Sequence, residues 1–305
     1  MTDEPRYYYR LFGLGLASEL EIPGLAACKP CVPELEIEYG KVKEKLDHPL
    51  SEGVLFESTH EEFLLRLPGV GKFLASEGKH ISLEAEPGTS RDELLVFVLG
   101  SVLGAILHQR GFLPMHASAI QTGSGALLIT GHSAAGKSTL AAALNKAGFP
   151  LVSDDLSAVS LDNRGRLIVH PGLPWMKLWK DSRDALYPGH SFKRVRPLLE
   201  KFNVPVSGKL RSTEVLPITR MLSLSTKNTP GIALSRIRGA MKFPLMREHI
   251  FRDQLLKGMG LQEHHFGLLA RLAAQVELYT VERPSVPLET EALRDEVLQM
   301  IRQDS

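Results

Sequence analysis

Cysteine is scarce in this chain of 305 residues: the only two are Cys28 and Cys31, spaced C-x-x-C. A zinc site would need two more ligands, and no second cysteine pair is present to supply them. A thioredoxin-type redox pair needs its own βαβ context, whereas Pro23 to Pro33 has the composition of a loop. We therefore expect two ordinary thiols in a reducing cytoplasm.

A strong net charge and a long apolar run are also missing. Lysine and arginine number 36 against 35 for aspartate and glutamate, so no strong field is directed at nucleic acid or a membrane surface. The longest apolar run, Leu94 to Leu107, has about 14 residues and contains two glycines, which is typical of a buried helix and too short for a bilayer. Met1 to Arg6 lacks the basic-then-apolar pattern of a signal sequence. These absences predict a cytoplasmic protein without a nucleic-acid or membrane partner.

The charges are unevenly distributed along the chain. Residues 1–115 contain 11 basic and 18 acidic side chains, a net of −7, whereas residues 180–257 contain 16 basic and 6 acidic ones, a net of +10. A basic segment of this kind suits a polyanionic nucleotide or an acidic partner, and a solvated basic face is the alternative.

One stretch fits a phosphate-binding pattern at every required position. Gly131 to Thr139 reads G-H-S-A-A-G-K-S-T and matches G-x-x-x-x-G-K-[ST]. The apolar run Ala126 to Thr130 before it predicts a buried strand. Leu140 to Ala147 after it is rich in good helix formers and is followed by Gly148, which predicts a helix and its end. Both flanks that the pattern requires are present, which disfavours a chance match on a surface turn.

In such a loop the glycines let backbone N–H groups approach an anion, and the helix N-terminus adds positive potential. We expect Lys137 to reach the β- and γ-phosphates of a nucleoside triphosphate and the Ser138 hydroxyl to hold Mg²⁺. ATP and Mg²⁺ are therefore the expected cofactors. The other candidate nucleotide-binding residues are the remaining members of the loop: Gly131, His132, Ser133, Ala134, Ala135, Gly136 and Thr139.

Two neighbouring stretches add side chains that suit group transfer. Leu113 to Thr122 predicts a strand that carries His116 and lies beside the strand before the loop. Phe149 to Ser153 predicts another buried strand, and Asp154 and Asp155 follow it directly. Because ligands of open α/β sheets bind beyond the carboxyl ends of strands, we expect both carboxylates near the phosphates.

The two carboxylates are expected to divide the work, because adjacent side chains on an extended chain point in opposite directions. One would bind Mg²⁺ or its waters, and the other would accept a proton from an attacking hydroxyl. The alternative for the pair is a helix N-cap or a turn. For His116, a structural and a functional role both remain open.

The region before residue 89 is predicted to be a smaller, mostly β domain. Glu34 to Tyr39 alternates strictly between acidic and apolar residues, which is typical of a half-buried strand. Ser90 and Glu93 form a capping-box pattern at the start of an apolar helix that ends near Gln109 and should begin the nucleotide-binding domain. We therefore predict an α/β protein with domains at residues 1–88 and 89–305.

Together, His116, the loop and Ser153-Asp154-Asp155 resemble the catalytic domain of the HPr kinase/phosphorylase family. In that family a histidine lies on the strand before a G-x-x-x-x-G-K-S loop, and an Asp-Asp pair ends the strand after the loop's helix. The wider pattern is similar to the HPr-kinase-related kinases of peptide-modifying gene clusters, some of which phosphorylate a serine of a lasso-type precursor peptide. Three further runs carry that likeness: Ser18 to Leu25, Leu173 to Trp179 and Glu200 to Pro205.

The resemblance implies a role for each matched residue. Asp155 would be the general base toward a serine hydroxyl, Asp154 would lie beside it near the metal, and His116 would lie close to the transferred phosphoryl group. The resemblance also implies a P-loop, HPr kinase-like fold for the catalytic domain and assembly into homo-oligomers. There are two departures: His132 stands where the family has aspartate, and Ser235 to Gly239 lacks the glutamate of the family's downstream metal-binding run.

Three functions are compatible with these residues. The first is ATP-dependent transfer of the γ-phosphoryl group to a serine of a peptide or protein, with the basic segment 180–257 as the acceptor groove. The second is the same chemistry on a small-molecule hydroxyl, and the third is a P-loop NTPase or nucleotide-switched binding module. The doubled aspartate and His116 favour transfer to a hydroxyl. Besides Lys137, the expected neutralising cations are one or more of Arg236, Arg238 and Arg252.

Overall fold

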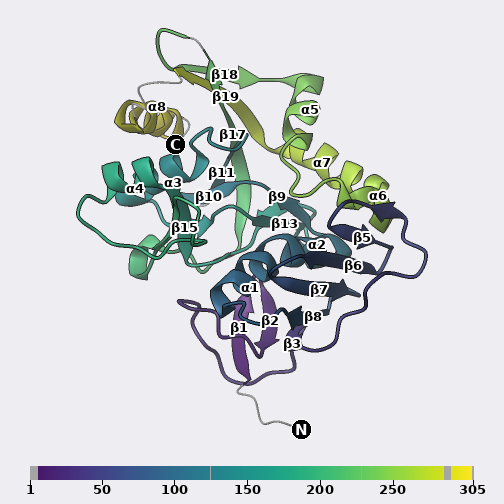
Figure 1. Ribbon diagram of the computed structural model, residues 1–305. Coiled ribbons are helices and arrows are strands. Elements are labelled where there is room, and N and C mark those ends of the chain that lie inside the picture. The colour runs from purple at the N-terminus through teal and green to yellow at the C-terminus, as the bar shows by residue number, and fades with distance from the viewer. Residues whose placement is uncertain (1–5, 124, 228, 285–289, 304–305) are drawn as a thin grey trace. The chain divides into compact units, whose positions relative to one another are not determined.

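The computed structural model describes residues 6–123, 125–227, 229–284 and 290–303. It is a mixed α/β protein, coloured along the chain in Figure 1, and it divides into two compact units. The first unit runs to Pro114 and also contains Phe251–Gly267. The second contains Met115–Ile250 and the residues from Leu268 onward.

The first unit is built on one mixed sheet. Its strand order within the described residues is β1-β2-β3-β8-β7-β6-β5-β4, so β3 and β8 pair in parallel although they are far apart in the sequence. In β3 the predicted alternation is confirmed, since Leu35 and Ile37 are buried whereas Glu36 and Glu38 are partly exposed. The strands are β1 (Tyr7–Leu11), β2 (Leu14–Ser18), β3 (Leu35–Tyr39), β4 (Ser51–Glu52), β5 (Phe56–Ser58), β6 (Glu62–Leu67), β7 (Gly71–Ser76) and β8 (His80–Ala85).

A helical stretch, Arg91–Gln109, packs on this sheet (Figure 1). It consists of α1 (Arg91–Phe97), a π-helical turn (Val98–Val102) and α2 (Leu103–Gln109). The predicted capping box is confirmed: the Ser90 hydroxyl accepts from the Glu93 N–H, and the Glu93 carboxylate accepts from the Ser90 N–H. The stretch has 19 residues and is longer than the apolar run within it, so by length and composition alone it could span a membrane. However, 61% of its most apolar segment is buried within the protein.

The first compact unit does not end at residue 88, where the sequence predicts a domain boundary. The units are defined by which residues pack together and not by their order along the chain. Residues 89–114 pack against the first sheet, where the rings of Phe73 and Phe97 lie 6.1 Å apart. The segment after Ile250 joins them, and a Cβ on Gly104 would lie 2.7 Å from the Phe251 ring, so glycine permits the close approach of this ring. The division into residues 1–88 and 89–305 stays a prediction about where each domain begins.

The second unit contains a sheet that brings two strand ends to one edge. Strand β10 (Ser118–Thr122) lies between β11 (Gly125–Gly131) and β12 (Leu151–Ser153) and is antiparallel to both. Because each neighbour opposes β10, β11 and β12 run in the same direction and end at the same edge. The phosphate-binding loop and the Asp154-Asp155 pair therefore begin side by side. Ser124, between β10 and β11, lies outside the described residues.

On its other side β11 pairs in parallel with the long strand β17 (Leu216–Lys227). The far edge of β17 pairs with β14 (Leu167–Val169) near its start and then with β19 (Glu277–Pro284). Strands β13 (Ser157–Leu161) and β14 form an antiparallel hairpin, with Val159 opposite Val169. The remaining strands are β9 (Leu113–Met115), β18 (Ala233–Ile237), and the two-stranded ribbon of β15 (Trp175–Trp179) and β16 (Lys201–Pro205).

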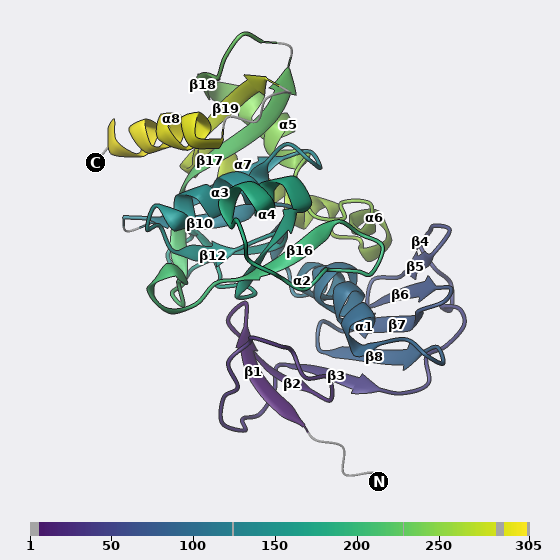
Figure 2. The ribbon, with the colours of Figure 1, turned by 60° about the vertical axis from the view of Figure 1, so that its left-hand side comes forward.

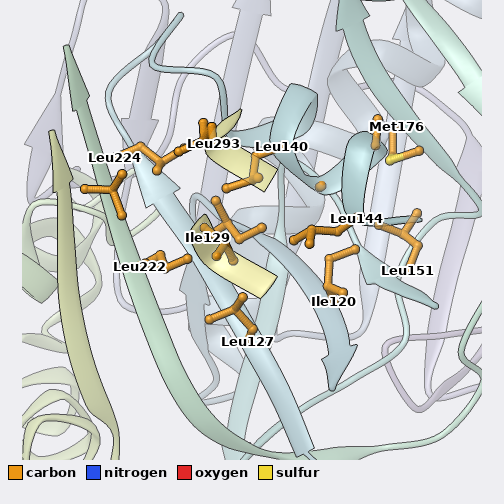
Figure 3. Packing of buried hydrophobic residues seen from close by; sticks show 14 of the residues in the cluster. Ile120, Leu127, Ile129, Leu140, Leu144, Leu151, Met176, Leu222, Leu224 and Leu293 are labelled. Atoms are coloured by element: carbon orange, nitrogen blue, oxygen red, sulfur yellow. The ribbon is translucent and has the colours of Figure 1, made fainter. Parts of the chain in front are cut away.

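Helix α3 (Lys137–Lys146) follows the loop and anchors it to the core of the second unit. Leu140 and Leu144 pack with Ile129 of β11, and all three are fully buried, which stabilises the unit by about 1.5–3 kcal/mol for each side chain (Figure 3). Leu293 of α8 (Thr290–Gln303) closes this core, and α3 also contacts β15. Helix α3 contacts α4 (Lys180–Leu186) as well (Figure 2). The other helices are α5 (Lys242–Arg247), α6 (Leu255–Met259) and α7 (Gln262–Gln275), with short 3-10 turns at Gly208–Leu210 and Gly239–Met241.

Candidate phosphate-transfer site

The loop between β11 and α3 adopts a backbone that requires glycine at two positions. Gly131 has φ 145°, and a Cβ there would lie 2.5 Å from the Leu224 carbonyl oxygen. Gly136, the residue before α3, has φ 104°, in the left-handed region that favours glycine. Both glycines of the motif thus allow the loop to curl at the start of the helix, whose free N–H groups form an anion-binding terminus.

Lys137 folds back into this loop. Its Nζ donates hydrogen bonds to the carbonyl oxygens of Gly131 at 2.7 Å and His132 at 3.2 Å. The residue is buried, and burial lowers the pKa of its ammonium, while the carboxylates of Asp155 and Asp154 oppose that change. The ammonium is therefore held at the mouth of the loop, where an incoming phosphate would compensate its desolvation.

The Asp154 carboxylate is directed at the loop. Its Oδ1 accepts from the hydroxyls of Ser138 at 2.9 Å and Ser118 at 2.5 Å, and its Oδ2 accepts from the Lys177 backbone N–H at 2.8 Å. A carboxylate next to a hydroxyl fits Mg²⁺, which usually takes one or two protein oxygens and completes its shell with waters and phosphate oxygens. Among the described residues no group of three or more His, Cys, Asp or Glu side chains is arranged to hold a metal ion. Ser138 and Asp154 therefore suit a metal that arrives with its nucleotide.

Asp155 faces a different direction from Asp154. Its backbone has φ 69°, and its Oδ2 lies 2.7 Å from the Nζ of Lys177. Burial raises the pKa of the Asp155 carboxyl, but the nearby ammonium groups of Lys177 and Lys201 outweigh burial and hold the pKa below its usual range. Asp155 is consequently an ionised carboxylate at neutral pH, at the wall of a pocket.

His116 lies in a bend between β9 and β10 rather than on a strand, so the strand predicted from Leu113 to Thr122 is interrupted here. The bend forms because the His116 N–H donates to the His249 carbonyl oxygen at 2.8 Å. Its Nδ1–H donates to the backbone oxygen of Asp155 at 2.9 Å, and Nδ1 lies 3.6 Å from Asp155 Oδ1. Burial and the charge of Lys137 lower the pKa of His116, so the imidazole is neutral at neutral pH.

These groups line one cleft of about 90 Å³ that opens to solvent. Six loop residues reach it, Ser133, Ala134, Gly136, Lys137, Ser138 and Thr139, together with His116 and Asp155. Gly131, His132 and Ala135 do not line it. The His132 side chain is 79% exposed, and its Nε2 lies 3.9 Å from the Glu248 carboxylate.

Three cations at the cleft were not predicted from the sequence. Lys177 and Lys201 come from the β15–β16 ribbon, and Arg283 comes from β19. The Arg283 guanidinium is buried and donates twice to the Ala135 carbonyl oxygen, at 3.1 and 2.9 Å, which fixes the back of the loop. Lys177 lies in the Leu173 to Trp179 run and Lys201 in the Glu200 to Pro205 run, so both stood in stretches that the sequence singled out without a role for the lysine, whereas Arg283 lies in no motif.

The arginines expected from the basic segment are elsewhere. Arg236 pairs with Glu277, and its guanidinium faces the Tyr279 ring at 6.0 Å. Arg238 is not among the residues that line the cleft, and Arg252 belongs to the first unit. None of the three is among the residues that line the cleft, and their expected role in neutralising charge stays a prediction.

The charged side chains around the cleft favour the binding of a polyanion. Lys137, Lys177, Lys201 and Arg283 surround the cleft, and Asp155 at its wall and Asp154 beneath it leave an excess of two positive charges. Thr139 and Ser182 close one side through a hydroxyl–hydroxyl hydrogen bond of 2.8 Å. The arrangement can hold phosphates beside an ionised carboxylate.

Comparison with solved structures gives likenesses, one of which is to a kinase/phosphatase. The chain is similar to the Hpr(Ser) kinase/phosphatase from Coxiella burnetii, with 16% identity, a TM-score of 0.31, and coverage of 63% of this chain and 94% of that one. No protein-family model matches the chain, and no curated protein matches it. A TM-score this low transfers neither fold nor activity.

Proposed function

We propose that the protein is an ATP-dependent kinase that transfers the γ-phosphoryl group to a serine hydroxyl of a peptide or protein. The observation that carries this proposal is the division between two adjacent carboxylates. Asp154 accepts from Ser138 in the loop, whereas Asp155 lines the open cleft beside His116. The carboxylate on the metal side holds the cation, and the second one provides a place for the proton of an acceptor hydroxyl.

In the proposed reaction the loop N–H groups and Lys137 bind the phosphates. The acceptor oxygen forms a bond to the γ-phosphorus while the bond from that phosphorus to the β–γ bridging oxygen breaks. The hydroxyl proton passes to the Asp155 carboxylate, and ADP leaves with the bridging oxygen. Ser138 and Asp154 would hold Mg²⁺, which supplies charge neutralisation at the phosphates when it is bound. Lys177, Lys201 and Arg283 add positive charge around the same oxygens.

Asp155 is a weak base because of its depressed pKa, and this is compatible with phosphoryl transfer. The transition state of this reaction is loose, so catalysis rests mainly on positioning and charge neutralisation rather than on strong proton abstraction. A neutral His116, whose Nδ1–H donates to the Asp155 backbone, helps to fix the orientation of that residue. The two lysines of the ribbon keep Asp155 ionised and thus able to accept a hydrogen bond from the acceptor.

The finer parts of the proposal rest on the sequence resemblance. These are a P-loop, HPr kinase-like fold for the catalytic domain, a cytoplasmic location, assembly into homo-oligomers and a lasso-type precursor peptide as one acceptor. A small-molecule hydroxyl as the acceptor would use the same residues.

ATP turnover with and without acceptors tests the proposal. We expect slow ADP release from ATP and Mg²⁺ alone, and a gain of about 80 Da on a serine peptide when a pool of such peptides is added. Lys137→Ala should abolish both signals, which controls for a contaminating kinase. Rapid ADP release without any acceptor, unchanged by peptides or by small hydroxyl compounds, would instead identify an NTPase.

A further inference from the structure

The first unit contains a second cavity, unrelated to the phosphate-binding loop. It has a volume of about 370 Å³, within the range of small-molecule sites. All of its lining residues belong to the first unit, between Val54 and Ser101 and between Arg252 and Leu255. It is bounded by β5, β6, the π-helical turn and the start of α6.

The floor of this cavity is apolar. Phe63, Leu65 and Leu67 alternate along β6 and share one face of the sheet, and Phe56 of β5 pairs opposite Leu65 on that face. At the rim, Val54 is 97% exposed and Leu55 is 40% exposed. A contiguous apolar surface around a cavity is a feature of ligand-binding grooves.

The polar groups of the cavity are few. Arg252, Gln254 and Ser101 are the three polar residues among its lining residues. Arg252 has φ 54°, a strained conformation for this residue type, and within the described residues it forms no ion pair. Ser101 is part of the π-helical turn Val98–Val102, an irregularity that is frequent at functional sites.

We propose that this cavity binds a single-chain alkyl carboxylate, with the alkyl chain on the β5–β6 face and the carboxylate on Arg252. An arginine guanidinium pairs well with a carboxylate, and the apolar floor matches an alkyl chain. An extended peptide fits less well, because its backbone N–H and C=O groups would find no partners on the floor. The ligand class therefore follows from one cation at the wall and an apolar floor.

Calorimetric titration of the full chain with sodium decanoate, below its micelle-forming concentration, tests this proposal. We expect saturable binding, and we expect Arg252→Gln to weaken it about tenfold, the effect of losing one charge-assisted hydrogen bond at an exposed position. Lys257→Gln removes an exposed cation of the same unit that does not line the cavity, and it should change nothing. Titration with 1-decanol, which has the chain without the charge, should be unaffected by Arg252→Gln.

A second variant tests the cavity itself. Ser101→Phe adds a ring at the wall and should abolish binding of both probes, with its folding checked by circular dichroism. Absence of saturable decanoate binding to the wild-type chain would overturn the proposal. Equal decanoate affinity in Arg252→Gln and the wild type would also overturn it, because the carboxylate would then have no specific partner. Neither result bears on phosphoryl transfer, which uses residues of the second unit.

Discussion

The ammonium of Lys177 lies 2.7 Å from the carboxylate of Asp155, across 22 positions of the chain. This ion pair links the β15–β16 ribbon to the end of β12, at the wall of the phosphate cleft. It also sets the protonation state of the residue that we assign as the proton acceptor, because the charge of Lys177 opposes the effect of burial on its pKa.

Lys177→Met should shift the pH dependence of phosphoryl transfer. Without this ammonium, burial is less opposed and the pKa of Asp155 rises, so the acidic limb of the kcat profile moves to higher pH. Lys177→Arg keeps the charge and should keep the limb near its wild-type position. The measurement is kcat against pH for all three proteins, and an acidic limb that does not move in Lys177→Met contradicts the assignment.

Gly136→Ala should weaken nucleotide binding more than it weakens the fold. Residue 136 has φ 104°, and an added Cβ would lie 3.4 Å from the Arg283 guanidinium that supports the loop. Gly148→Ala is the matched control at the other end of α3, because it has φ 99° and nothing lies within 4 Å of its added Cβ. Both variants should lose about 1 kcal/mol of unfolding free energy. Only Gly136→Ala should lower ATP affinity, by about tenfold or more in equilibrium binding.

Two serines donate to the same carboxylate oxygen, and replacing each in turn tests metal binding separately from a structural role. Ser138 and Ser118 both donate to Asp154 Oδ1, but only Ser138 lines the cleft. Ser138→Ala should raise the Mg²⁺ concentration for half-maximal activity at least tenfold. Ser118→Ala should cost about 1 kcal/mol of stability and leave the Mg²⁺ dependence near that of the wild type. Equal Mg²⁺ dependence in the two variants would remove Ser138 from the metal site.

Part of this site was predictable because its sequence signals are local. The loop needs Gly131 and Gly136 at fixed spacing, and a buried strand directly before Asp154 indicates a strand end. Strands β11 and β12 run in the same direction because both pair antiparallel with β10, which lies between them. The sequence predicted that β10 lies beside β11, but not that β10 also pairs with β12. The sequence-based expectation that these groups lie near each other therefore agrees with the geometry, although the catalytic roles remain predictions.

The rest of the site depends on contacts between distant segments. Lys201 is 64 positions after Lys137, and Arg283 reaches Ala135 from a strand 148 positions later. No local sequence pattern predicts such contacts. The arginines of the basic segment were therefore expected to neutralise charge only because basic residues are frequent there. The bend at His116 escaped prediction for the same reason, since it depends on the carbonyl of His249.

The buried pair His108 and His265 should make stability fall in mild acid. The His108 Nδ1 and His265 Nε2 lie 3.0 Å apart, and burial lowers the pKa of His108 to about 3 and of His265 to about 4. Because these pKa values lie below the unfolded value, the unfolded chain binds more protons from about pH 6.5 downward. Stability from this source is complete above that pH and decreases as the pH falls toward 4.

Each histidine contributes of the order of 3 kcal/mol to this decrease, by the shift in its pKa. Urea unfolding between pH 7 and pH 4 measures it. His265→Gln should flatten the slope of unfolding free energy against pH, whatever its effect on stability at pH 7. A slope identical to that of the wild type would show that the pair is not neutral in the native protein.

The role of Asp155 is tested most directly by following labelled γ-phosphate from ATP to a serine peptide in wild type and Asp155→Asn. Nucleotide affinity, measured in parallel, should stay within about threefold, because the proposed mechanism assigns phosphate binding to Lys137 and the loop. Transfer should fall by about 100-fold or more, the usual contribution of a positioned general base. Full transfer by Asp155→Asn onto every acceptor that the wild type phosphorylates would contradict the proposed mechanism.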